Sequence, residues 1–159
     1  CYTGHHMENA NFRMEQFDAA VLNGTATWWQ MHLPSGKVSF GDAKADMLGY
    51  PASKFKHYQD FVDLVHPDDT EKTMGAMRDH LAGKAKLYET TYRIRNKDGA
   101  YINFYDCGQI TKKEGAEVTV TGFVLKIPDD THALEHMAHF KDLILEGNPS
   151  IITLVSRIR

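Results

Sequence analysis

The sequence is short of the features that mark several classes of protein. Its 159 residues include only two cysteines, and one of these, Cys1, is the first residue. We therefore expect no structural disulfide, as is usual in a reducing compartment. No apolar run approaches the roughly 18 residues that a membrane-spanning helix needs, and no signal-peptide pattern is present. These absences predict a cytoplasmic domain without direct membrane contact, which could still belong to a larger, membrane-attached protein.

Strong charge of one sign is also missing. The formal net charge is −3, which gives no reason to expect nucleic acid or an anionic membrane as a partner. The sequence contains no nucleophile elbow, no P-loop and no HExxH helix. With 42% apolar and 25% charged residues, the chain resembles ordinary globular domains in composition. We therefore predict a domain that folds around its own core, has no catalytic residues and is not itself an enzyme.

The two ends of the sequence differ in pattern from its middle. Residues 1–7 end in a His-Met junction and are interpreted as an expression-vector remnant. Residues 8–23 predict an amphipathic flanking helix, and residues 24–128 the domain core. Residues 129–159 predict signalling helices, or a linker to an output domain that this sequence does not include. The last residues stop inside a helical pattern, which indicates a piece of a longer protein.

Periodicity and turn residues predict an α+β order of elements. Strands are expected at residues 26–33, 38–40, 86–95, 100–110 and 117–127. Helices are expected at residues 42–48, 51–55, 58–65 and 67–81. Pro67 suits the first turn of the longest helix, and Asp98-Gly99 is typical of a tight hairpin turn. In the last strand both faces are apolar, so a flanking helix or a partner subunit must cover the outer face.

Four segments in this order resemble the sequence motifs of PAS domains. They are MLGYP at residues 47–51, LVHPDD at 64–69, YETTYRIR at 88–95 and KDG at 97–99. Gly122 also fits, and the resemblance covers residues 23–127. It implies a PAS fold, with a five-stranded antiparallel sheet and helices across one face. It also implies a sensor of light, redox state, oxygen or small molecules that dimerises through flanking helices.

Two positions depart from the family pattern. Asn103 stands where many PAS domains have a tryptophan. Lys126-Ile127-Pro128 stands where the family often has Asp-Ile-Thr, whose aspartate ties the sheet to the output helix. The connection between core and output helix is therefore expected to be rearranged.

The inner face of the sheet is the expected place for a ligand. Alternation allows only one of Trp28 and Trp29 to face inward. A ligand pocket and a filled core are both compatible with the pattern. The candidate pocket residues are Trp28, Trp29, Leu64, His66, Met77, Tyr88, Tyr92, Ile94, Val120 and Val124. His66 is also open to a purely structural interpretation, in which it bonds nearby backbone.

The cofactor stays unknown at this point. A photoactive flavin site needs an Asn-Cys-Arg segment, which is absent, and Cys107 is interpreted as a small buried hydrophobe. Non-covalent flavin stays possible. Haem is less favoured, because His80 on the long helix does not match the ligand position of haem-binding relatives, which lies near Lys72. His132, His136 and His139 have metal-site spacing, but exposed helices show it too, and no metal site is predicted.

These observations predict a sensory and regulatory domain that binds a small molecule or cofactor, forms a homodimer and controls a C-terminal output domain. That output domain would be of the chemoreceptor, histidine kinase or diguanylate cyclase type. The candidate dimer and signalling residues are Phe17, Phe123, Leu125, Met137 and Phe140. The alternative is a ligand-free interaction module that only dimerises. A haem or flavin redox or gas sensor is a third, less favoured interpretation.

Overall fold

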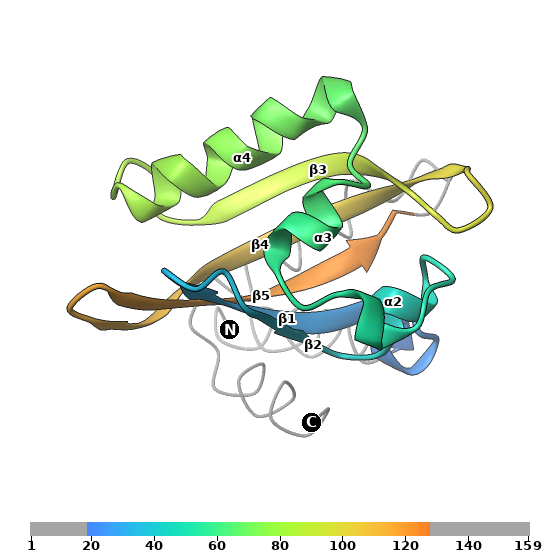
Figure 1. Cartoon of the computed structure of the whole chain (residues 1–159), viewed down its shortest axis with the longest axis horizontal. Coiled ribbons are helices and arrows are strands. Elements are labelled where there is room, and N and C mark those ends of the chain that lie inside the picture. Colours follow the sequence, from blue (N-terminus) through green and yellow to red (C-terminus); the bar gives the residue numbers. More distant parts are fainter. Residues whose placement is uncertain (1–18, 128–159) are drawn as a thin grey trace, which may run out of the picture.

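The computed structural model describes residues 19–127, which form one sheet with most of the helices on one face (Figure 1). In chain order the elements are β1 (Ala26–Leu33), β2 (Val38–Phe40), α2 (Ala43–Asp46), the 3-10 turn η1 (Ala52–Lys54), α3 (Tyr58–Val62), α4 (Pro67–Leu81), β3 (Tyr88–Arg95), β4 (Tyr101–Glu114) and β5 (Glu117–Lys126). This order confirms the predicted α+β succession. Of the predicted N-terminal helix, residues 19–22 are described and are helical.

The lengths of several elements differ from the prediction. β4 continues to Glu114, four residues beyond its predicted end, because Lys112 to Glu114 still pair with the start of β5. These extra residues are polar and exposed, so hydrophobic alternation could not reveal them. α2, η1 and α3 are each shorter than predicted.

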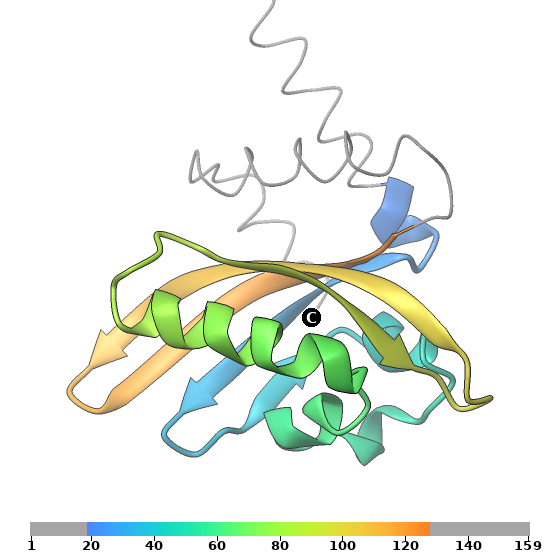
Figure 2. The ribbon, with the colours of Figure 1, turned by 90° about the horizontal axis from the view of Figure 1, so that it is seen from above.

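The five strands form an antiparallel sheet in the order β2-β1-β5-β4-β3. β1 therefore lies beside β5, the last strand of the chain. Figure 2 shows α2, α3 and α4 on the same side of this sheet. No helix in the described part of the chain is long and apolar enough to cross a membrane.

The two predicted motifs around Pro67 and Arg93 join α4 to the sheet. His66 caps α4, because its Nδ1 accepts a hydrogen bond from the Asp68 N–H at 3.1 Å. Asp69 then receives two hydrogen bonds from the Arg93 guanidinium, at 2.8 and 2.9 Å, and a third from the Arg93 backbone N–H at 2.9 Å. The start of the helix is therefore bound to the middle of β3 by charge as well as by apolar contact.

The sheet has an apolar core on each face. The inner core lies between the sheet and the helices and includes Trp29, Tyr92 and Phe104. The outer core is smaller. Its members are Ala26, Tyr105, Cys107 and Leu125, with Ala20, Val21, Leu87, Phe123 and Ile127 packed against them. The prediction that both faces of the last strand are apolar is confirmed.

Candidate functional site

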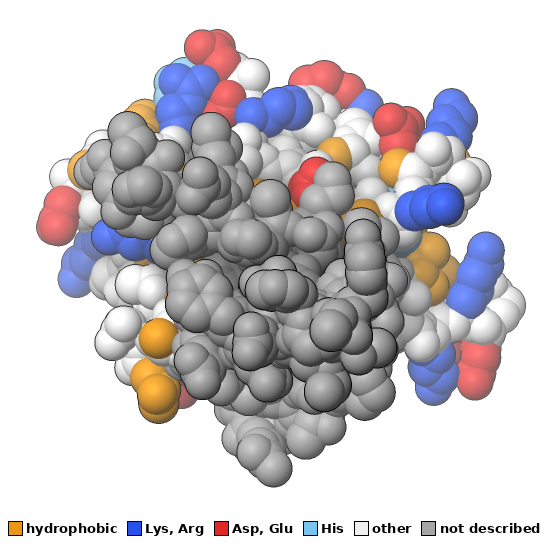
Figure 3. Space-filling view, turned by 180° about the vertical axis from the view of Figure 1, so that it is seen from behind, with side chains coloured by type: hydrophobic (Ala, Val, Ile, Leu, Met, Phe, Trp, Pro, Cys, Tyr) orange, Lys and Arg blue, Asp and Glu red, His pale blue; other side chains and the backbone are white. Residues whose placement is uncertain are grey.

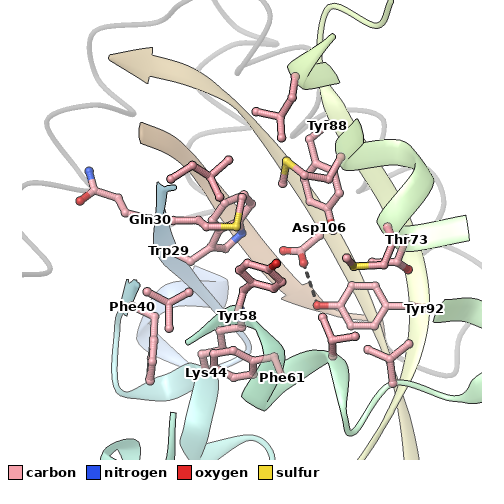
Figure 4. Close-up of a pocket in the computed structure, with 18 of the residues that line it drawn as sticks. Trp29, Gln30, Phe40, Lys44, Tyr58, Phe61, Thr73, Tyr88, Tyr92 and Asp106 are labelled. Carbon is pink, nitrogen blue, oxygen red and sulfur yellow. Dashed lines mark hydrogen bonds between the residues drawn. The ribbon is translucent and has the colours of Figure 1, made fainter. Parts of the chain in front are cut away.

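A cavity of about 230 Å³ lies between the inner face of the sheet and the helices α3 and α4. Its walls are mostly apolar or aromatic, with a few polar side chains from four different elements. The cavity is lined by Trp29, Gln30, Met31, Leu33, Val38, Phe40, Lys44, Tyr58, Phe61, Val62, Val65, Thr73, Met74, Met77, Arg78, Leu81, Tyr88, Tyr92 and Asp106. Figure 4 shows that the side chain of Gln30 points away from this space, whereas Trp29, Tyr92 and Asp106 converge on it. Such a space, with apolar walls and few polar groups, is typical of small-molecule sites.

Two glycines make room for the indole of Trp29 on the sheet. Gly122 pairs with Trp29 across β1 and β5, and Gly108 pairs with Gly122 across β4 and β5. A Cβ atom at Gly122 would stand 2.5 Å from the indole, and one at Gly108 would stand 2.9 Å from it. The absence of both side chains lets the ring approach the backbone closely and form one wall of the cavity.

Asp106 is the polar centre of the cavity. It points inward from β4, and its Oδ2 accepts a hydrogen bond from the Tyr92 hydroxyl at 2.7 Å (Figure 4). Its Oδ1 and the Trp29 Nε1 are both buried, and neither has a hydrogen-bond partner in the described part of the chain. Burial raises the pKa of Asp106, while Lys44, Tyr92 and the nearby Trp29 indole act in the opposite direction.

Lys44 brings a second charge to the cavity from the short helix α2. Its side chain is buried, and its Nζ lies 3.9 Å from the centre of the Phe61 ring and 5.9 Å from that of Trp29. Burial lowers the pKa of Lys44, and the charge of Asp106 partly opposes this. The two charged residues therefore stabilise one another across an apolar space, although they form no direct ion pair.

Two tyrosines complete this wall. Burial raises the pKa of Tyr88 and of Tyr92, and the negative charge of Asp106 raises both further. Both side chains therefore stay neutral, and Tyr92 serves as a hydrogen-bond donor. Tyr88 packs edge-on against Trp29, with the ring centres 5.8 Å apart.

The structure distributes the predicted pocket residues over three places. Trp29, Met77, Tyr88 and Tyr92 line the cavity. Four others contribute to the inner core without lining it, and these are Leu64, Ile94, Val120 and Val124.

The remaining two lie elsewhere for local reasons. Trp28 is buried on the opposite face of β1, where it pairs with Phe123, as alternation requires once Trp29 faces inward. His66 is occupied in capping α4, which agrees with its structural interpretation.

Lys44 and Asp106 were not predicted as site residues. Asp106 did leave a signal, because it is a charged residue at an inward position of an alternating strand, between Phe104 and Gly108. Lys44 left none, because a lysine in a short helix is ordinarily exposed.

The residues considered for cofactors occupy structural positions. His80 Nε2 accepts a hydrogen bond from the Ile110 N–H at 3.0 Å, and its Nδ1 lies 2.9 Å from the Ala85 carbonyl oxygen. Both ring nitrogens are therefore engaged, and His80 is not presented to the cavity as an iron ligand. Cys107 is buried in the outer core, on the face opposite the cavity. Among residues 19–127 no group of three or more His, Cys, Asp or Glu side chains could hold a metal ion. The histidines 132, 136 and 139 lie outside the described residues.

Comparison with known protein families decides the classification. The family model described as "PAS fold" matches residues 37–124, more than half of the chain. This chain belongs to the PAS family. The resemblance predicted from the four motifs is therefore confirmed. A comparison with curated protein sequences found no match.

Solved PAS structures share this architecture at low sequence identity. A sensory box histidine kinase/response regulator from Burkholderia thailandensis is 20% identical with a TM-score of 0.59, and the alignment covers 82% of this chain and 98% of that one. The N-terminal domain of a diguanylate cyclase with a PAS/PAC sensor from Marinobacter aquaeolei is 24% identical with a TM-score of 0.58, covering 70% and 98%. The PAS-B domain of Drosophila melanogaster Cycle with bound ethylene glycol is 16% identical with a TM-score of 0.51, covering 63% and 98%. These likenesses establish the fold of this PAS domain, and its ligand must be argued from its own residues.

Proposed function

We propose that this PAS domain is a non-catalytic sensory module that binds a small molecule in the cavity and relays its presence to an output domain of the same protein. The main support for this proposal is a cavity of about 230 Å³ whose lining includes buried polar atoms of Trp29 and Asp106 without hydrogen-bond partners in the described part of the chain. Buried polar atoms of this kind are costly unless a partner satisfies them. A bound molecule would supply that partner.

The position of Asp106 supports the relay. Asp106 is paired with Val124 across β4 and β5, and β5 ends two residues later at Lys126. The Lys126 N–H donates to the Thr25 carbonyl at 2.8 Å, and the Ile127 N–H donates to the Asn103 carbonyl at 2.9 Å. A ligand that shifts Asp106 therefore acts close to the segment that leaves the domain. The histidine kinase and diguanylate cyclase among the similar structures favour an output domain of one of these kinds.

Ligand binding can be tested through the fluorescence of Trp29. The chain has two tryptophans, and Trp28→Phe leaves the one that lines the cavity as the reporter. In this background, a metabolite library is screened by fluorescence and hits are checked by native mass spectrometry. We expect at least one hit that Val62→Phe abolishes, because a phenyl ring at that position fills part of the cavity. Val118→Phe is the matched control, since Val118 packs on the same core outside the cavity wall. The absence of any hit would favour the ligand-free interaction module instead.

We also propose that the domain forms a homodimer through the outer face of its sheet. Phe123 and Leu125 contribute to the outer core there, and an apolar sheet face requires a cover. Around the rim of this side, acidic and basic side chains are mixed (Figure 3), so apolar contact would dominate association. Sedimentation velocity should show a dimer that Phe123→Glu converts to a monomer, whereas Ser53→Glu, which adds the same charge at an exposed site in η1, leaves it unchanged. A monomeric wild-type protein at high concentration would contradict this proposal.

The remaining predicted signalling residues, Phe17, Met137 and Phe140, lie outside the described residues. The same holds for the flanking segments 8–18 and 129–159, so their roles stay predictions. The cytoplasmic location likewise stays a prediction of the sequence.

A further inference from the structure

We propose that the ligand of this cavity is an electrically neutral molecule with an apolar body and one polar head that both donates and accepts hydrogen bonds, as a primary amide does. This inference rests on the proposed function and names the chemistry of its ligand. It follows from the polar groups that face the cavity, from their charges and from the nature of the remaining walls.

At Asp106 and Trp29 the cavity presents one acceptor and one donor side by side, and the Thr73 hydroxyl is a third buried polar group of its lining without a hydrogen-bond partner in the described part of the chain. Asp106 is 5% exposed and Trp29 is 6% exposed. The indole Nε1 lies close enough to Asp106 to favour its charged form (Figure 4), but neither Nε1 nor Oδ1 has a hydrogen-bond partner of normal geometry among the described residues. A head group with an N–H or O–H for Asp106 and an oxygen for Trp29 would satisfy both atoms.

Lys44 adds a second hydrogen-bond donor to the cavity and, together with Asp106, determines which charge the ligand can carry. Its Nζ lies over the Phe61 ring at 3.9 Å, and Lys44 is part of the cavity lining. The opposite charges of Lys44 and Asp106 compensate one another, because each favours the charged form of the other. A ligand carboxylate would be attracted by Lys44 but repelled by Asp106, and an ammonium group would meet the reverse. A neutral head avoids both conflicts and can accept from Lys44 while it donates to Asp106.

The other walls require an apolar body of limited size. Met31, Leu33, Val38, Met77 and Leu81 surround the rest of the space. An apolar cavity of about 150 Å³ in another protein accommodates benzene. By proportion, 230 Å³ would accommodate a body and head of about nine non-hydrogen atoms. A single ring on a short chain with one polar end has this size.

Four probes of nearly equal shape test the head group. They are hydrocinnamamide, which is neutral and both donates and accepts, hydrocinnamate, which is anionic, phenylpropylamine, which is cationic, and propylbenzene, which has no head. Titrations of the wild-type protein by calorimetry and by Trp29 fluorescence should show that the amide has the highest affinity. We expect it to bind at least about tenfold more tightly than each of the other three.

Two variants that each remove one charge should change the order of the probe affinities in opposite directions. Asp106→Asn leaves Lys44 uncompensated, so hydrocinnamate should gain at least about tenfold relative to the amide. Lys44→Met leaves Asp106 uncompensated, so phenylpropylamine should gain by a similar factor. Matched controls are Glu89→Gln, a carboxylate that is bonded to a tyrosine on the other face of the sheet, and Lys54→Met, a lysine 4.9 Å from the Tyr50 ring centre. Neither control residue lines the cavity, so neither should change the order.

The wild-type order tests the inference even where a variant fails to fold. An amide preference with opposite shifts in the two variants supports it. Equal binding of all four probes, or a preference for a charged probe in the wild type, overturns it while leaving the cavity as a binding site. If no probe binds to correctly folded protein, this inference is overturned, and the metabolite screen described above decides separately whether the cavity binds another molecule.

Discussion

The two faces of the sheet carry the same hydrogen-bonded motif in opposite environments. On the inner face Tyr92 of β3 donates to Asp106 of β4 at 2.7 Å, and on the outer face Tyr105 of β4 donates to Glu89 of β3 at 2.6 Å. Each pair joins residues that are diagonal neighbours across the same two strands. The pairs therefore share their backbone geometry and differ in what surrounds them.

That difference explains why only one pair forms a candidate site. Asp106 is fully enclosed and faces a cavity that also contains Lys44, whereas Glu89 lies half-buried beside the outer core. Burial raises the pKa of Tyr105, as it does that of Tyr92, so both hydroxyls stay protonated and can donate. The inner pair can serve as a recognition group because it borders the cavity, whereas neither residue of the outer pair lines it.

The largest effect should come from removing the room for Trp29 on the inner face. In Gly122→Ala the new Cβ would stand 2.3 Å from the Cys107 carbonyl oxygen as well as 2.5 Å from the indole. We expect a loss of about 3 kcal/mol in the free energy of unfolding, measured by urea denaturation. Gly75→Ala is the control, because its Cβ would meet nothing closer than 3.6 Å and alanine favours helices. Equal stability of the two variants would contradict the close approach of Trp29.

The comparison of the two pairs can be tested directly by removing each hydroxyl. Tyr92→Phe leaves an enclosed carboxylate without its partner and should cost about 2 kcal/mol of unfolding free energy. Tyr105→Phe leaves Glu89, which water can reach, and should cost about 0.5 kcal/mol. Chemical denaturation at neutral pH measures both. If the outer variant loses as much as the inner one, the two environments do not differ as described.

A third test uses the carboxylate that joins α4 to the sheet. Hydrogen bonds from Arg93 hold the pKa of Asp69 well below its ordinary value. The folded protein therefore binds this proton less readily than the unfolded chain does. The resulting stabilisation is present above the ordinary Asp pKa of about 3.9 and is lost as the pH falls below it.

Asp69→Asn should accordingly lower stability at neutral pH and make it less dependent on pH in the acidic range, as thermal unfolding across a pH series would show. Burial shifts the pKa of Asp106 the other way, so its titration cannot produce the same slope. Parallel pH profiles for the wild type and Asp69→Asn would be inconsistent with the Arg93 contact.

The smallest effect is expected when the two inner charges are removed together. Lys44→Met combined with Asp106→Asn should change the free energy of unfolding by about 1 kcal/mol or less, since paired buried charges contribute little net stability. Each single variant should cost more, because it leaves one buried charge uncompensated. A double variant less stable than both singles would show that the two residues stabilise the fold independently.

Local pattern was a good guide to the elements and a partial guide to the site. Alternation placed Tyr88 and Tyr92 inward and left only one tryptophan for the inner face, and the structure has all three as cavity walls. Alternation could not show that Val120 and Val124, which also face inward, do not border the cavity. Which inward residues face an unfilled space depends on how far α3 and α4 stand from the sheet.

Contacts between distant segments were harder to predict. Asp69 was predicted as a favourable charge at a helix start, and its three hydrogen bonds from Arg93, twenty-four positions later, were not. Lys44 was not singled out at all, because its burial depends on Phe61 and Trp29 lying around it.

The sequence by itself determined the order of the elements and the hairpin turns, because these depend on periodicities of two and 3.6 residues and on the backbone preferences of glycine and proline. The resemblance to the PAS family came from four sequence motifs. Tertiary structure alone decided that Asp106 and Lys44 lie at one cavity, because strand pairing and helix docking bring together positions 62 residues apart in the chain. It also decided that the inner tyrosine–carboxylate pair borders this cavity, whereas neither residue of the outer pair lines it. Side-chain type specifies which face of a strand is buried, and only three-dimensional fit specifies how completely that face is filled.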